Sequence, residues 1–306
     1  ARNSEVVHGG LYYPSGSSKA RFCVQGREQL YQYCDERQIA YWKLGKLIVA
    51  ADYKQMKTDL KGLDDLSQAN NYTTTRLLSA TDVQAMEPSV QCAGALWSPE
   101  TGVVDSHGLM TSFLAEAEEG GATLAVQSPV EAAHITAEGA VQLCVDGTWI
   151  TSQCIVNCAG LWADHVARLI HNNNDNSGTP QWTPPRQYYC RGNYFRLTGV
   201  SPTPFSHLIY PLPDRWGGLG IHATLDRTGQ VKFGPNVEWV DATTQPTDLD
   251  YVPSESEVAS FYESIRQYWP DLPDDSLYPD YVGIRPTLSQ PTLVGSSTTS
   301  PFQDTG

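Results

Sequence analysis

Several segments of the sequence combine small residues with groups that could bind an anion or take up a proton. The first, residues 2–13 (RNSEVVHGGLYY), carries polar donors, then His8, then two glycines and aromatic residues. The donors could hold a pyrophosphate, and Gly9 and Gly10 would let a flat ring lie against the backbone. A solvated tail followed by a strand is the simpler interpretation of the same residues.

The second segment, residues 154–163 (CIVNCAGLWA), has the pattern of a strand, a small-residue turn and a helix. A strand that ends in small residues lets a ligand approach the backbone, and the following helix offers free N–H groups and the positive end of its dipole. A phosphate would suit that position. A tight strand–helix turn without a ligand would show the same pattern.

Two shorter segments carry single groups of interest. In residues 283–286 (GIRP), Arg285 is fixed between Gly and Pro and could pair with a carboxylate through two hydrogen bonds, although most such arginines are surface residues. His222 lies in a strand pattern (LGIHAT), where a histidine is more often a core residue than a catalyst. No metal-binding spacing such as HExxH, no GxSxG elbow and no GxxxxGK[ST] loop occurs, so no metal is expected.

The composition limits the classes of partner. The chain has 306 residues, 40% of them hydrophobic, and a net charge of -14. That is enough apolar material for two domains or one large one. Nucleic acid is not expected as a partner, because phosphate binding requires clustered Lys and Arg and no basic run occurs. The sequence contains no uninterrupted apolar run of about 18 residues, so no membrane-spanning helix is expected. A peripheral membrane contact is compatible with the sequence.

The cysteines indicate a reducing compartment. There are seven, an odd number, and no CxxC pair is found. They are therefore predicted to be reduced, mostly buried thiols, which favours an intracellular protein.

The elements that must position these groups can be predicted from periodicity and capping signals. Helices are expected at residues 19–37, within 52–69, after a cap at Thr81, from a cap at Ser106 to Gly120, and at residues 162–170 and 255–268. Strands are expected at residues 46–51, 122–126, 130–136, 141–145, 154–157, 187–197, 207–212, 219–224 and 230–233. The polar loop 172–177 and the prolines after it are predicted to form the main internal boundary.

Taken together and in order, nine segments resemble the D-amino-acid-oxidase-like superfamily of FAD-dependent oxidoreductases. Within it, they are most similar to the L-2-hydroxyglutarate dehydrogenase/oxidase group. The segments are RNSEVVHGGLYYP, KARFCVQG with YCDER, GKLIVA, LWSPETGVVDSHGLM, VNCAGLWA, HLIYPLP, GLGIHATLD, FGPNVEW and GIRP. They are spread over nearly the whole chain.

The resemblance implies an α+β or α/β fold, in which an FAD-binding Rossmann-like domain is interleaved with a substrate domain built on a large antiparallel sheet. Residues 1–45 and 106–180 would belong mainly to the FAD domain, and residues 46–105 and 181–280 mainly to the substrate domain. Residues 281–306 would return to the FAD domain. The GxGxxG unit that opens such domains is not found, and the family's last strand and helix do not follow residues 301–304. We therefore expect an incomplete FAD domain and weak or no FAD binding by residues 1–306 alone.

The resemblance also implies a reaction. The family group oxidises the C2 alcohol of L-2-hydroxyglutarate to a ketone, with hydride transfer to flavin N5 and electrons passing on to a quinone, oxygen or another acceptor. Such an enzyme would lie in the bacterial cytoplasm, at the inner membrane, or in the mitochondrion of a eukaryote.

Site residues follow from the resemblance by position. His8 and His222 would face the substrate hydroxyl, and a neutral imidazole there could accept its proton. Arg285 would bind the substrate carboxylate, and Tyr194 would border the pocket. Contacts to FAD are expected from Arg2, Asn3, Ser4, His8, Gly9, Val130, Ala159, Gly160 and Trp162.

Two other functions stay open at this level. A related flavin enzyme acting on an amino acid or another amine would use the same carboxylate-binding Arg, so the pocket around Tyr194 and His222 must decide. A truncated, non-catalytic chain that serves as a binding module would also explain the missing glycine loop.

Overall fold

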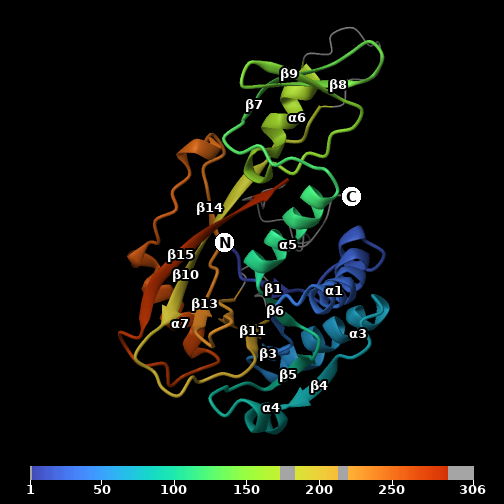
Figure 1. Ribbon diagram of the computed structural model, residues 1–306. Coiled ribbons are helices and arrows are strands. Elements are labelled where there is room, and N and C mark those ends of the chain that lie inside the picture. Colours follow the sequence, from blue (N-terminus) through green and yellow to red (C-terminus); the bar gives the residue numbers. More distant parts are fainter. Residues whose placement is uncertain (1, 173–182, 213–219, 289–306) are drawn as a thin grey trace.

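The computed structural model describes residues 2–172, 183–212 and 220–288 (Figure 1). A large sheet and its helices make up the lower body of the molecule in this view, and a small sheet with helix α6 forms a separate lobe above it. The predicted loop 172–177, beyond residue 172, and the segment 301–304 lie outside the described residues. None of the helices in the described ranges is both long and apolar enough to cross a bilayer.

The large sheet has nine strands in the order β14-β10-β13-β12-β11-β3-β5-β4, and β15 pairs with β10. Their bounds are β3 Lys46–Ala50, β4 Arg76–Ser79, β5 Gly94–Ser98, β10 Tyr188–Leu197, β11 Leu208–Pro211, β12 Ala223–Leu225, β13 Val231–Phe233, β14 Glu238–Trp239 and β15 Leu277–Thr287. The described pairings are antiparallel except that of β11 with β3, which is parallel. The expected large antiparallel sheet is therefore present, and β11 joins its early strands to its late ones.

A second, three-stranded sheet has the order β1-β6-β2, with β1 at Val6–Val7, β6 at Gly102–Val104 and β2 at Tyr41–Trp42. Helix α1, Ser18–Arg37, packs on it. The helix buries Ala20, Val24, Arg27, Tyr31 and Cys34. These residues recur every three or four positions and so share one face. This arrangement sets the N-terminal segment between α1 and the large sheet.

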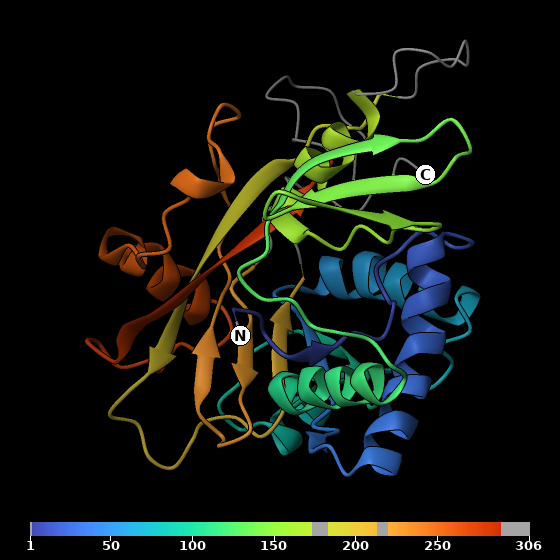
Figure 2. The same cartoon turned by 45° about the horizontal axis from the view of Figure 1, so that its top comes forward.

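The upper lobe holds the third sheet and α6. Strands β7 Val130–Ile135, β8 Val141–Val145 and β9 Thr148–Ser152 pair only as β7-β8-β9 within the described chain. Asp146 and Gly147 both have positive φ, as a two-residue hairpin turn requires. Helix α6, Ala163–Asn172, lies against β7 (Figure 2).

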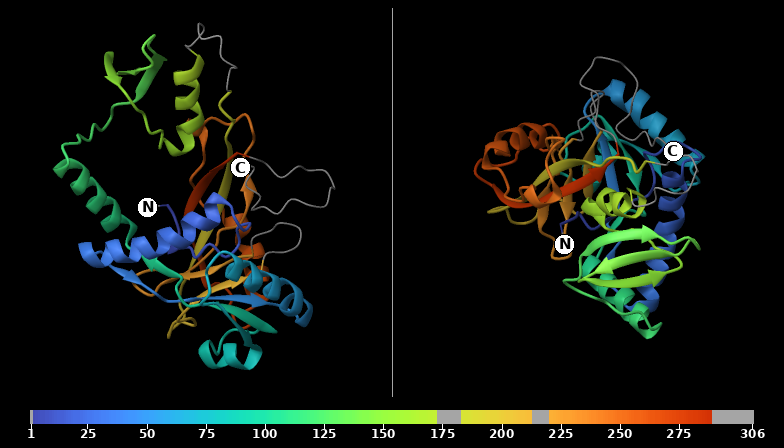
Figure 3. Two further views of the ribbon diagram at one scale, coloured as in Figure 1. Left: turned by 90° about the vertical axis from the view of Figure 1, so that its right-hand side faces the viewer. Right: turned by 90° about the horizontal axis from the view of Figure 1, so that it is seen from above.

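Figure 3 shows the remaining helices from two further sides. They are α2 Tyr53–Gln55, a π-helix Met56–Leu60, α3 Lys61–Ala69, α4 Ala80–Met86, α5 Ser106–Glu119, α7 Val258–Arg266 and the 3-10 turns Gly160–Trp162, Pro246–Asp248 and Glu255–Glu257.

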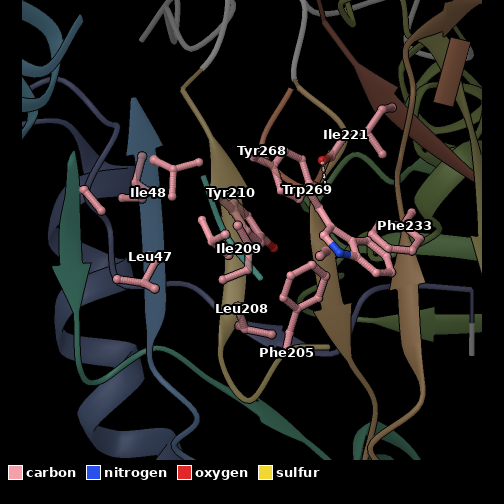
Figure 4. Packing of buried hydrophobic residues seen from close by; sticks show 14 of the residues in the cluster. Leu47, Ile48, Phe205, Leu208, Ile209, Tyr210, Ile221, Phe233, Tyr268 and Trp269 are labelled. Atoms are coloured by element: carbon pink, nitrogen blue, oxygen red, sulfur yellow. Dashed lines mark hydrogen bonds between the residues drawn. The ribbon is translucent and has the colours of Figure 1, made fainter. Parts of the chain in front are cut away.

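The main core lies on the large sheet and is closed by α7 and the residues after it (Figure 4). Phe261 of α7 is fully buried and its ring lies 4.5 Å from that of Phe195 on β10. Tyr268 donates a hydrogen bond of 3.0 Å to the carbonyl of Ile221. This bond fixes the backbone immediately before His222.

Two predicted helix caps were wrong. Helix α4 begins at Ala80, and its cap is Ser79, whose hydroxyl accepts from the Asp82 N–H while the Asp82 carboxylate accepts from the Ser79 N–H. The cap therefore lies at Ser79, two residues before the expected cap at Thr81. Helix α5 is capped by Asp105, which accepts from the Gly108 N–H, and Ser106 is its first residue.

Two predicted strands are not formed. Residues 122–126 and 154–157 have no strand structure, and Val156 is 80% exposed. An extended segment becomes a strand only when another strand supplies hydrogen bonds to its backbone, and no described strand lies beside these two. Apolar composition alone was a misleading signal here.

Candidate active site

Residues that are far apart in the sequence meet around one cavity of about 280 Å³, near the lower end of the usual range for small-molecule sites. His8, Tyr194, His222 and Arg285 all line it, as do Arg2, Asn3 and Ser4. We refer to it as the histidine cavity. It therefore brings together the expected catalytic and substrate-binding residues with the polar N-terminal donors.

The N-terminal segment is held against β15 by several contacts. Tyr281 donates a 2.9 Å hydrogen bond to the Asn3 carbonyl, and Arg2 donates one of 3.3 Å to the Val282 carbonyl. The Arg2 guanidinium also lies 4.3 Å from the centre of the Tyr251 ring. These contacts place the donors of residues 2–4 at the cavity.

His222 is fixed by stacking and by its backbone. Its imidazole lies parallel to the Tyr210 ring, with 3.6 Å between the ring centres and 10° between the planes. Its carbonyl accepts a 3.0 Å hydrogen bond from the Gly234 N–H. Burial lowers the pKa of His222 well below its usual value, and the nearby charges of Lys46, His8 and Arg285 lower it further.

His8 approaches the cavity from the N-terminal segment. It lines the cavity, and part of its surface is accessible to solvent. Desolvation, together with the positive charge of Lys46, lowers the pKa of His8 to about 4. Both imidazoles are therefore uncharged at neutral pH and can each accept a proton.

Arg285 lies on β15 opposite Cys190 of β10. Its guanidinium donates to the Cys190 sulfur at 3.6 Å, the one hydrogen bond found for this side chain among the described residues. A guanidinium has five N–H donors in a planar fork, so enough remain to bind a carboxylate. The neighbouring Tyr194 ring stacks on Tyr281 at 4.3 Å, and burial raises the pKa of Tyr194.

The other predicted cofactor residues lie outside the cavity lining. Gly9 follows His8, but the Cβ that it lacks would point at the Tyr72 ring, 2.7 Å away. Val130 begins β7 in the upper lobe. Ala159, Gly160 and Trp162 belong to the turn before α6, which is held at the start of β10 by hydrogen bonds from Gln187 and Tyr189. The structure does not bring these residues to the histidine cavity.

Sequence reasoning missed Lys46 and the tyrosines around it. Lys46 begins β3, is fully buried, and places its amine 4.9 Å from the centre of the Tyr12 ring and 4.7 Å from that of Tyr210. Its Nζ has no hydrogen-bond partner among the described residues. Burial lowers the pKa of Lys46 to about 7. A lysine that opens the otherwise apolar run KLIVAA was the available signal.

The electrostatic character of the cavity is the opposite of that of the whole chain. Its described lining contains Arg2 and Arg285 and no carboxylate, although the chain carries a net charge of -14. Such a site can hold an anion and can take up a proton from it or from a neighbouring hydroxyl.

Comparison with known proteins gives the family. A sequence profile of FAD dependent oxidoreductases matches residues 1–301. The chain belongs to this family. The FAD-dependent oxidoreductase described here is 38% identical, over 95% of its length, to the mitochondrial L-2-hydroxyglutarate dehydrogenase of Arabidopsis thaliana, and covers 66% of that protein. It is 33% identical to the human mitochondrial L-2-hydroxyglutarate dehydrogenase, over 76% of the chain and 51% of the relative. The chain thus spans about half to just under two thirds of these relatives.

Solved structures confirm the fold of this FAD-dependent oxidoreductase. The L-alpha-glycerophosphate oxidase of Mycoplasma pneumoniae with FAD bound aligns with a TM-score of 0.79 at 18% identity, over 93% of this chain and 72% of that one. The glycine oxidase of Geobacillus kaustophilus aligns with a TM-score of 0.72 at 15% identity, over the same shares of the two chains. At these identities the likeness concerns the fold.

FAD is the cofactor of the family, and the described residues fit an anionic group of this kind. Arg2, Asn3 and Ser4 offer N–H and O–H donors at the cavity, as a diphosphate needs. The absence of carboxylates from the described lining removes the repulsion that such a group would otherwise meet.

Proposed function

We propose that this chain forms the substrate-facing part of an enzyme that oxidises L-2-hydroxyglutarate to 2-oxoglutarate with FAD. The observation that carries the proposal is the meeting of two uncharged imidazoles and the Arg285 guanidinium in one cavity. A 2-hydroxy acid presents a carboxylate and a hydroxyl on adjacent carbons, which are the groups that this arrangement could hold. The similarity to L-2-hydroxyglutarate dehydrogenases over most of the chain supports the choice of acid.

In this proposal, each residue of the cavity has a distinct role. Arg285 binds the carboxylate through two N–H donors and so fixes the position of C2. His222 or His8 accepts the proton of the C2 hydroxyl as the carbonyl forms. When bound, FAD supplies the acceptor for the hydride that leaves C2. Stacking on Tyr210 holds the His222 ring in one orientation, which keeps its nitrogen available to the hydroxyl.

The cofactor contacts belong to the same proposal. Arg2, Asn3 and Ser4 would donate hydrogen bonds to the diphosphate, and His8 and Gly9 would lie near the flavin ring. For Gly9, Val130, Ala159, Gly160 and Trp162 the support is the family resemblance alone, because they lie outside the cavity lining.

The electron acceptor and the location also stay proposals. A quinone, oxygen or another small acceptor would reoxidise the enzyme. Because the plant and human relatives are named as mitochondrial, we infer a mitochondrial location if the source is a eukaryote. Comparing turnover with oxygen, a soluble quinone and a dye would identify the acceptor.

Turnover by the full-length protein tests the function. With a dye as acceptor, L-2-hydroxyglutarate should be oxidised and D-2-hydroxyglutarate and glycine should not. The variants His222→Gln and Arg285→Met should lose activity, whereas Arg227→Met, which removes an exposed arginine outside the cavity lining, should not. Faster turnover of an amine, or full activity of either cavity variant, would contradict the assignment.

A further inference from the structure

The amine of Lys46 is buried and makes no hydrogen bond with the residues that the structure describes. It lies at the start of β3 with no exposed surface. Its neighbours are the faces of Tyr12 and Tyr210, both of which line the histidine cavity. Burying an unpaired amine is costly, so retaining one beneath the cavity calls for an explanation in function rather than in stability.

The distances connect this amine to the imidazoles. Its Nζ lies 4.7 Å from the centre of the Tyr210 ring, and the centre of that ring lies 3.6 Å from the centre of the His222 imidazole. These two distances place the Lys46 Nζ no more than about 8 Å from the centre of the His222 imidazole. In a buried site, two like charges at that distance repel strongly enough to change a proton affinity by about tenfold.

We propose that Lys46 is an electrostatic positioning residue that keeps the imidazoles of His8 and His222 uncharged and ready to accept a proton. This inference rests on the proposed function and deepens it, because it assigns the control of the proton acceptor to a residue outside the cavity lining. The titratable and charged side chains that line the same cavity are Arg2, His8, Tyr12, Tyr13, Tyr194, Tyr210, His222 and Arg285. Since none is a carboxylate, nothing in this set opposes the effect of the lysine.

The pH range of the effect follows from the amine itself. Burial lowers the pKa of Lys46 to about 7, so the amine is charged below that pH. Imidazoles take up protons in that acidic range, and there the charge of Lys46 repels the incoming proton. The lysine thus extends the working range of the proton acceptor toward lower pH.

The variants Lys46→Met and Lys46→Gln of the full-length protein test the proposal. Met keeps the length of the side chain without its charge, and Gln provides a second uncharged replacement if Met perturbs packing. Lys43→Met is the matched control, since Lys43 lies 4.4 Å from the centre of the Tyr31 ring but is exposed. We expect the acid limb of the kcat/KM profile to move up by about one pH unit in both Lys46 variants and to stay in place in the control.

A second readout does not depend on turnover. NMR titration of ¹³C-labelled histidines, assigned with His8→Gln and His222→Gln, should show the cavity imidazoles taking up protons at higher pH in the Lys46 variants. Unchanged titrations in folded Lys46 variants would overturn the proposal, whatever their activity. If the wild type oxidised no 2-hydroxy acid but the titrations moved, the proposed function would fail while the role of Lys46 stood.

Discussion

Replacing Gly9 by Ala should disturb both the stability of the fold and the position of His8. A Cβ at residue 9 would lie 2.7 Å from Cε1 and 3.3 Å from Cδ1 of Tyr72, well inside van der Waals contact. The Tyr72 ring is 1% exposed, its hydroxyl is 2.6 Å from the Ser98 hydroxyl, and the Arg27 guanidinium lies over it. The ring therefore has no space into which it can retreat, and the backbone of residues 8 and 9 must move.

The expected magnitude follows from this overlap. Overpacking a filled site costs about 1–3 kcal/mol, and each kcal/mol lowers the melting temperature by roughly 2–4 °C in a chain of this size. A displacement of His8 by about 1 Å could reduce kcat/KM by roughly 100-fold. Thermal unfolding and steady-state kinetics of the full-length protein measure the two effects separately.

Gly26→Ala provides the control within α1. No heavy atom lies within 4 Å of the Cβ that it would add, so we expect a gain of about 0.5–1 kcal/mol from the better helix former. If Gly9→Ala melted like Gly26→Ala, the steric argument would be refuted. If it melted lower but kept full kcat/KM, the link between Gly9 and the position of His8 would be wrong.

Three further outcomes are expected. Arg285→Met should lower kcat/KM by roughly 10- to 100-fold, the loss of a charged hydrogen bond worth about 1.5–3 kcal/mol, while circular dichroism melting stays unchanged because the side chain is exposed. Phe261→Ala should lower the free energy of unfolding by about 3–5 kcal/mol in urea titrations, whereas Phe113→Ala, at a residue 50% exposed, should cost far less. The pKa of Lys46 is about 7 when folded and near 10.5 when unfolded, so between these values the unfolded chain binds more protons and stability should rise with pH. Lys46→Met should lack this contribution, and equal pH slopes of unfolding free energy for variant and wild type would contradict the pKa assignment.

Local patterns in the sequence predicted the helices and strands whose own residues show a clear periodicity or an apolar run. Helix α1 and strands β3 and β10 begin and end within a residue or two of their expected bounds. Their signal is the spacing of apolar residues along consecutive positions, which the sequence shows directly. The order of the motifs predicted the family and the large sheet. It also predicted which side chains could share a site, and His8, Tyr194, His222 and Arg285 do line one cavity.

Features that depend on distant partners were not predictable in this way. Strand β15 contains Pro279 and Pro286, which argue against a strand unless it lies at a sheet edge. Among the described strands, β15 pairs with β10 alone. The expected strand at residues 154–157 has the composition of a strand, but no described strand pairs with it. The lysine that opens the run KLIVAA was a local signal, but its place beside the histidine cavity was not predictable, because Tyr12 and Tyr210 reach it from other parts of the chain.

The parallel pairing of β11 with β3 sets an order of events during synthesis. Strand β3 can pair with β5 soon after it emerges from the ribosome, but its other edge meets Leu208–Pro211, about 160 residues later in the chain. At roughly 5–20 residues per second this gap lasts about 8–30 s. During that interval, the edge of β3 that later pairs with β11 has no partner strand, although β3 is apolar and fully buried in the folded protein. The nascent chain should therefore depend on chaperones until β11 arrives, and slower translation between the two strands should increase its aggregation.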